Sequence, residues 1–496
     1  MSFRAERGIC FSPDFCSQRS VPLGPIPTTM SNQLYEMTLA DVAALIRTKQ
    51  VSPVEVTTQA LERIERLNPR LNAFWTVTAE LARKQARAAE TEIAKGEYRG
   101  PLHGVPIGLK DLIFTRGIRT TAGSKIMRDF VPNSDATVVE KLRQAGAVLV
   151  GKTALHEFAY GMTNDNPHFG PTRNPWNPER ISGGSSGGSG VAVATGMVFA
   201  ALGTDTGGSI RIPASFCGIA GLKPTHGRVS LHDVYPLGYT LDHLGPLART
   251  VVDVGLVYQV IAGFDPKDAF SVDHVLGEVG LKKSLSGVRV GVPSDYFFDC
   301  VQPDVERLVR KAVEVMEDLG AVVTSASLPG MMALTEASRI TLLAEAYVVH
   351  KQHLESHPDD LGRDVKLLIE RGKEVSGADY VRMQLTRYRA RRQLEQLFHD
   401  VDVIVTPATP LTAFPIGETK VTICGKEEDG RTAGTRLLRG FNATGHPALS
   451  VCCGFTNQGL PAGLQIVSRL WDEAAVLQAG YAYEQATEWH KRRPPT

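Results

Sequence analysis

The chain has 496 residues, of which 43% are hydrophobic and 22% are charged, an ordinary composition for a globular protein. Its 54 basic and 53 acidic residues leave a formal charge of +1, so no overall field favours nucleic acid or an anionic membrane as a partner. No apolar run approaches the roughly 18–20 uncharged residues of a membrane span.

The seven cysteines are scattered, odd in number and without a CxxC pair, which argues against a disulfide framework. A reducing, cytoplasmic location is therefore expected. Cys452 and Cys453 lie in an apolar run, and we expect them to be small residues of the core.

Residues 1–32 form the first recognisable stretch, rich in Pro, Ser and Arg without periodicity. They lack the long apolar run of a signal peptide, so we expect a poorly ordered tail. Three helices are predicted next: residues 39–49 capped by Thr38 or Asp41, a second opened by Ser52 and Pro53 that runs to about residue 67, and residues 79–94.

From residue 135 onward, helical stretches alternate with short apolar runs. Helices are predicted over 136–144 and 304–319, and strands over 147–150, 198–202, 288–292, 321–323, 403–406 and 447–451. This alternation predicts an α/β fold with a mixed, mostly buried sheet. Residues 335–400 are mainly helical and more charged, and we expect them to cover one side.

No internal repeat or linker-like stretch divides the chain, so residues 33–496 are expected to form a single domain. Within it, residues 33–100 supply N-terminal helices. Residues 101–265 form the core that carries the sequence motifs, and residues 266–496 supply a helical cover and the remaining strands.

A glycine- and serine-rich segment, RISGGSSGGSG, occupies residues 180–190. Taken alone it looks like a flexible linker. It is short, however, and continues directly into small apolar residues at 191–195 that suit a tightly packed helix. Its glycines would let the backbone approach a ligand closely and leave N–H groups free at a helix start, so Ser185 is a candidate functional residue.

A second segment, GTDTGGSIR, spans residues 203–211 after the predicted strand 198–202. Four consecutive N–H groups here would converge into an anion-binding nest: Thr206, Gly207, Gly208 and Ser209. Acyl transfer requires such a nest beside a serine hydroxyl to hold its oxyanion. A phosphate-binding or purely structural turn is the alternative, although the Gly-x-x-x-x-Gly-Lys pattern of a phosphate loop is missing.

Lys110 stands out in the segment LHGVPIGLKDLI, residues 102–113, because apolar residues flank it on both sides. Most lysines are solvated. Burial disfavours the charged form of an amine, however, and a neutral Lys110 would be able to act as a base.

Together these segments resemble the amidase signature family in order and spacing, strongly over residues 35–265 and more weakly to the end. The resemblance implies the amidase signature fold, a mixed central sheet with helices on both faces. It also implies a triad in which Ser209 is the nucleophile, Ser185 a bridging serine next to a cis peptide, and Lys110 the base.

The same resemblance assigns supporting roles in the second segment. The backbone N–H groups of residues 206–209 hold the oxyanion. Asp205 and Arg211 are expected to brace the loop, with an ordinary structural ion pair as the preferred interpretation. No metal or organic cofactor is expected, because the nest and Lys110 already supply the electrophile and the base.

Two other enzyme classes share fragments of these motifs. Residues 183–187 also fit Gly-x-Ser-x-Gly, the nucleophile elbow of α/β-hydrolases, but that fold needs a buried strand before the serine, and residues 173–180 contain two prolines instead. His156 begins a zinc-binding HExxH pattern whose second histidine is replaced by Tyr160. An inactive scaffold is disfavoured because all three triad residues are present.

Within the family, residues 161–190 look much like the A subunits of tRNA-dependent glutamine amidotransferases. The later half departs from them. Residues 347–352 read YVVHKQ where that subgroup has Ser-Asn-Leu-x-Arg-Tyr-Asp-Gly, and Thr435 stands where it has an acidic residue. Because lost charged contacts commonly cost a site its substrate, we expect a free-standing amidase, and a role within a glutamine-dependent tRNA amidotransferase is the alternative.

The expected reaction is hydrolysis of a carboxylic amide to acid and amine or ammonia through an acyl-enzyme. The expected partner is a small-molecule amide, not nucleic acid or a membrane, and a homodimer is left open. Balanced charge and the missing head-group contacts favour uncharged or aromatic amides, while esters, anilides and carbamates stay open.

Overall fold

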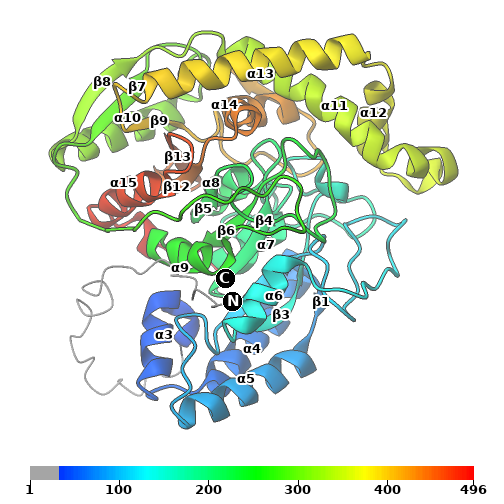
Figure 1. The fold of residues 1–496 in the computed structure, drawn as a ribbon, viewed down its shortest axis with the longest axis vertical. Coiled ribbons are helices and arrows are strands. Elements are labelled where there is room, and N and C mark those ends of the chain that lie inside the picture. The colour runs from blue at the N-terminus through cyan, green and yellow to red at the C-terminus, as the bar shows by residue number, and fades with distance from the viewer. Residues whose placement is uncertain (1–32, 496) are drawn as a thin grey trace, which may run out of the picture.

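The computed structural model describes residues 33–495 (Figure 1). The tail predicted over residues 1–32 lies outside the described residues. One sheet of 11 strands runs through the described chain, in the order β1-β3-β2-β4-β6-β5-β12-β13-β9-β7-β8. In chain order these strands are β1 (Phe74–Val77), β2 (Pro106–Lys110), β3 (Val148–Thr153), β4 (Ala200–Thr204), β5 (Ala220–Lys223), β6 (Leu244–Ala248), β7 (Arg289–Pro293), β8 (Val322–Ala326), β9 (Val403–Pro407), β12 (Ala448–Phe455) and β13 (Pro461–Ser468).

The sheet is mixed, as the sequence predicts. Strand β2 is parallel to both of its neighbours, β3 and β4. The middle of the sheet, from β4 through β6, β5, β12 and β13 to β9, is antiparallel. At the far edge β9, β7 and β8 are parallel again. Every residue of β2, β4, β5, β6 and β9 is buried, so helices cover both faces of the sheet.

The described chain contains the helices predicted from the sequence together with others that were not predicted. They are α3 (Leu39–Arg47), α4 (Pro53–Leu71), α5 (Ala79–Ala94), α6 (Thr137–Gln144), α7 (Gly187–Ala194), α8 (Arg211–Cys217), α9 (Val251–Ile261), α10 (Pro303–Asp318), α11 (Met331–Ser356), α12 (Arg363–Lys373), α13 (Gly377–Leu397), α14 (Gly430–Thr444) and α15 (Glu473–Gln485). The Thr38 hydroxyl accepts the N–H of Asp41 at 3.1 Å and caps α3, while Ser52 caps α4.

Residues 335–400, which were expected to cover one side of the fold, are mainly helical. Helices α11, α12 and α13 lie together at one end of the molecule, and the N-terminal helices α3, α4 and α5 lie at the other (Figure 1). A small hairpin, β10 (Lys420–Ile423) and β11 (Lys426–Asp429), lies outside the main sheet and precedes α14. Among the described residues no helix is both long and apolar enough to cross a membrane.

The prediction for residues 33–100 omitted a strand. Strand β1 lies between α4 and α5 and pairs with β3 at the sheet edge. The second helix also continues past residue 67, through Pro69, to Leu71. Cys452 and Cys453 are buried as predicted, and the five cysteines within the described chain are all free.

Candidate active site

Lys110 is the last residue of β2, and Thr204 is the last residue of the neighbouring parallel strand β4. Because parallel neighbours end at the same edge of a sheet, the two side chains meet there. Lys110 Nζ donates hydrogen bonds to Thr204 Oγ1 and to Ser185 Oγ, both at 2.8 Å. Burial lowers the pKa of Lys110 to about 7, although the negative charges of Asp242 and Asp205 oppose the shift.

Ser185 lies in the glycine-rich loop just before α7, and its side chain is fully buried. The Gly184–Ser185 peptide bond is cis. The next residue fastens this loop to the other motif, because Ser186 N–H donates to the Ser209 carbonyl at 3.3 Å and Ser186 Oγ donates to the Thr204 carbonyl at 3.1 Å. The two glycine-rich segments are therefore joined directly.

Ser209 lies in the turn between β4 and α8, where it lines a large cavity. Its side chain is only 7% exposed and lines this main cavity, which has a volume of about 990 Å³. Lys110 and Ser185 are covered completely. A small molecule in the cavity would thus reach Ser209 first, with Ser185 and Lys110 behind it.

The predicted four-amide nest needs a correction at Gly208. The Gly208 N–H donates to Asp205 Oδ1 at 2.7 Å, because the buried Asp205 carboxylate gathers the donors of its own turn. Three N–H groups of the turn have no hydrogen-bond partner within residues 33–495: Thr206, Gly207 and Ser209. These are the amides left to bind a ligand oxygen.

Asp205 and Arg211 form a buried, two-point ion pair that braces the turn. The Arg211 guanidinium donates to both carboxylate oxygens of Asp205, each at 2.9 Å. Arg211 also donates to Asn442 Oδ1 at 2.7 Å and to Gln465 Oε1 at 2.6 Å. Burial alone would raise the pKa of Asp205, but Arg211 holds it well below its usual range.

The walls of the main cavity come from segments far from the motifs in sequence. Helices α11, α12 and α14 and the loop before the hairpin β10–β11 surround it. Leu342, Leu343, Leu367 and Leu368 supply apolar surface. Helix α14 supplies Thr435 and Arg439, close to the nucleophile turn. The helical cover therefore forms part of the binding site as well as shielding the core.

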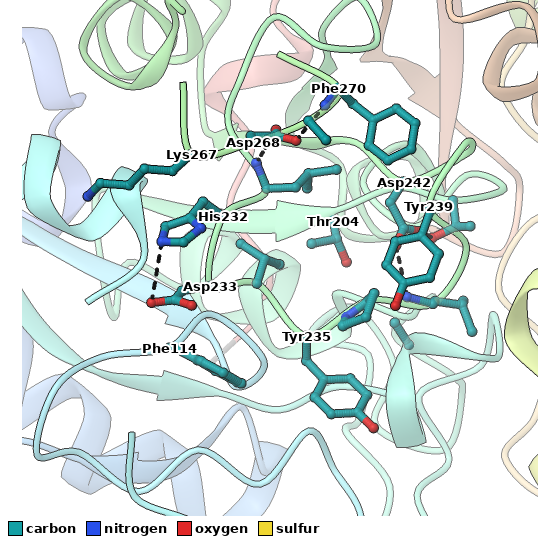
Figure 2. Close-up of a pocket in the computed structure, with 17 residues that line it drawn as sticks. Phe114, Thr204, His232, Asp233, Tyr235, Tyr239, Asp242, Lys267, Asp268 and Phe270 are labelled. Atoms are coloured by element: carbon teal, nitrogen blue, oxygen red, sulfur yellow. Dashed lines mark hydrogen bonds and ion pairs between the residues drawn. The ribbon is translucent and has the colours of Figure 1, made fainter. Parts of the chain in front are cut away.

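A second cavity of about 400 Å³ adjoins the first, and Thr206 lines both. Figure 2 shows Thr204 in the middle of this second cavity, with Asp242 and Tyr239 on one side and Asp233 on the other. Asp242 Oδ1 accepts the Thr206 hydroxyl at 2.6 Å. Burial raises the pKa of Asp242 to about 6, and the hydrogen bond from Thr206 opposes that shift.

The structure brings Lys110 and Ser185 into contact and ties their loop to that of Ser209. Four residues near this site were not predicted from the sequence: Thr204, Asp242, Arg439 and Gln465. Thr204 belongs to the same GTDTGGS segment as Ser209, and this closeness in sequence could have marked it as a candidate site residue. The other three reach the site from distant segments and carry no local pattern.

The HExxH-like fragment has ordinary structural partners. His156 Nε2 lies 2.9 Å from Asp364 Oδ2, and Glu157 accepts the Ser124 hydroxyl at 2.7 Å. Within the described chain, no group of three or more His, Cys, Asp or Glu side chains could hold a metal ion.

Comparison with known proteins gives a consistent result. Residues 55–477 match the sequence model of the Amidase family. The chain is 41% identical to the A subunit of the glutamyl-tRNA(Gln) amidotransferase of Moorella thermoacetica, over 93% of this chain and 99% of the relative.

Two solved structures share the fold. One, described as part of an unexpected vestigial protein complex that reveals the origins of an s-triazine catabolic enzyme, has a TM-score of 0.87 at 36% identity over 90% of this chain and 98% of its own. The other, a bacterial aryl acylamidase of the amidase signature family, has a TM-score of 0.82 at 29% identity over 92% and 97%.

Proposed function

Since the chain belongs to the amidase signature family, a family of amide hydrolases, we propose that it cleaves an amide through an acyl-enzyme on Ser209. One observation carries the proposal. A buried Lys110, with a pKa lowered to about 7 by burial, contacts Ser185 Oγ at 2.8 Å beside the turn that bears Ser209. A lysine that is partly neutral at physiological pH is able to act as a base.

The steps follow from these contacts. Ser209 Oγ bonds to the carbonyl carbon while its proton passes to Ser185, and Ser185 passes its own proton to neutral Lys110. The oxyanion is held by the free amides of Thr206, Gly207 and Ser209, and each such donor is worth about 3–4 kcal/mol.

The carbon–nitrogen bond then breaks. The leaving nitrogen takes a proton from Ser185, which recovers one from Lys110. Water repeats the same sequence on the ester formed at Ser209, releasing the acid and restoring both serines. All atoms and protons of the proposed steps are accounted for, and the steps use no cofactor.

The relatives include both an aryl acylamidase and subunits of amidotransferases, so two roles are open for this chemistry. Curated relatives that match over 93% of the chain include A subunits of amidotransferases, and they favour the alternative over the free-standing amidase expected from the sequence. Thr435, in place of the acidic residue expected in that subgroup, and the YVVHKQ stretch at 347–352 support the free-standing enzyme. The structural similarity to an aryl acylamidase supports it too.

Purified protein separates these settings. A free-standing amidase hydrolyses a simple amide without any other protein and leaves glutamine intact. A component of an amidotransferase hydrolyses glutamine, gains activity from its partner proteins, or co-purifies with them in the source organism. Either result leaves the reaction at Ser209 in place, while Ser209→Ala protein that turns over amides at the original rate would refute it.

A further inference from the structure

Arg439 projects from α14 into the main cavity, directly against the nucleophile turn. A methyl group placed on Gly207 would lie 3.4 Å from Arg439 Nη1, so the guanidinium faces the backbone that presents the free amides with room for about one methyl group between them. The positive charge is therefore next to the place where the scissile carbonyl binds in the proposed reaction.

This guanidinium has no counter-ion in the described chain. Its Nε donates to the hydroxyl of Thr435 at 2.8 Å, and its Nη1 is shielded from solvent without a hydrogen-bond partner. No carboxylate among residues 33–495 lies within ion-pair distance of it.

Two other arginines of the same cavity are paired. Arg431 lies 2.6 Å from Asp364, and Arg339 lies 2.5 Å from Glu336. Arg363 and Arg371 also line the cavity without an ion pair in the described chain, but both are exposed to solvent, whereas Arg439 is half-buried.

The groups that face Arg439 do not neutralise it. They are two phenols, two further cations and one carboxylate that is already paired with Arg339: Tyr160, Tyr296, Arg431, Arg339 and Glu336. Burial and the two cations lower the pKa of Arg439, although arginine stays charged near neutral pH. Arg439 is half-buried, and a charge held partly away from water without a counter-ion is unfavourable, so a position of this kind calls for an external anion.

We propose that the substrate of this site is an amide that carries a carboxylate close to the scissile carbonyl, and that Arg439 binds this carboxylate. A half-amide of a short dicarboxylic acid has that chemistry. An α-amino acid amide fits less well, since its ammonium would lie among Arg439, Arg431 and Arg339. This proposal rests on the amidase function proposed above. It departs from the expectation of uncharged amides, which was drawn from the balanced overall charge. That balance does not reveal the local excess of positive charge around Arg439.

The experiment compares matched substrates on wild-type protein and variants. Specificity constants are measured for succinamate and glutaramate, and for butanamide and pentanamide, which replace the carboxylate by a methyl group. Wild-type protein should prefer the half-amides. In Arg439→Met the ratio of half-amide to neutral amide should fall by about 100-fold, the usual size for loss of a buried charge partner.

Variants on the same helix serve as controls. Arg431→Met removes a cavity arginine that already has a partner, so the ratio should stay within about threefold. Thr435→Asp places a carboxylate beside Arg439 and should lower the ratio, whereas Thr435→Asn, of similar size and uncharged, should preserve it. Equal losses on both substrate types in Arg439→Met would show that the arginine supports the turn instead, and a wild-type ratio near one would overturn the proposal.

A binding measurement keeps this test separate from the reaction itself. Titration calorimetry of succinamate and glutaramate with Ser209→Ala protein needs no turnover. Binding that is lost in the Ser209→Ala/Arg439→Met double variant supports the anion site even if no amide is hydrolysed. Failure of Ser209→Ala protein to bind either half-amide, with butanamide turned over by the wild type, refutes the anion site and leaves the amidase function intact.

Discussion

Lys110 Nζ lies 2.8 Å from Ser185 Oγ, with both side chains fully buried. Because burial lowers the pKa of Lys110 to about 7, the rate should fall about tenfold per pH unit below that value as the amine takes a proton. Lys110→Met should lose activity by orders of magnitude and lose this acid limb. A pH–rate profile checks both points, and an acid limb that persists in the variant assigns the ionisation to another group.

Asp242, which lines the second cavity, should affect the pH at which the rate falls. Its negative charge raises the pKa of Lys110 against the effect of burial, so Asp242→Asn should lower that pKa. The acid limb would then move to lower pH, with the maximal rate reduced less than in Lys110→Met. A limb that stays in place, or moves to higher pH, would contradict the proposed coupling. Thr206→Val, which removes the hydroxyl bonded to Asp242, distinguishes a packing effect from a charge effect.

The buried Asp205–Arg211 pair should contribute more to the free energy of unfolding than any ion pair on the surface. Arg211→Met leaves a buried carboxylate without its cation, which typically costs about 3–5 kcal/mol of unfolding free energy. The exposed pair Lys311–Glu314 is the control, and Lys311→Met should cost below about 1 kcal/mol. Denaturant titration measures both, and equal losses would show that Arg211 is not a structural centre.

The residues that the structure brings together at the candidate site were easier to single out from the sequence than those around them. Lys110, Ser185 and Ser209 lie in one apolar segment and two glycine-rich turns, which carry recognisable patterns, and their catalytic roles stay a prediction. Arg439 and Asp242 were missed because each becomes significant only where distant chain segments meet. The strands β5 and β6 were missed for a related reason: AGLK and LGPLA carry little intrinsic strand preference, and their pairing with neighbours decides their structure.

The two adjacent glycines of the nucleophile turn should respond differently to alanine. Gly208 has φ of +124°, and an added Cβ would lie 2.5 Å from Leu438 Cδ1. Gly208→Ala should therefore lose about 1–3 kcal/mol of stability from strain and overpacking. At Gly207 the nearest contact of a Cβ would be 3.4 Å, so Gly207→Ala should unfold close to the wild-type temperature. Indistinguishable melting temperatures for the two variants would show that the turn is more pliable than its geometry suggests.

Identifying the acylated residue tests the central claim most directly. Wild-type protein is treated with a fluorophosphonate probe, digested, and the modified peptide is sequenced. We predict the label on Ser209, no label in Ser209→Ala, and weak labelling of Ser209 in Ser185→Ala, where the nucleophile and its amides remain. Label on Ser185, together with Ser209→Ala protein that still hydrolyses amides, would contradict the assignment of the nucleophile.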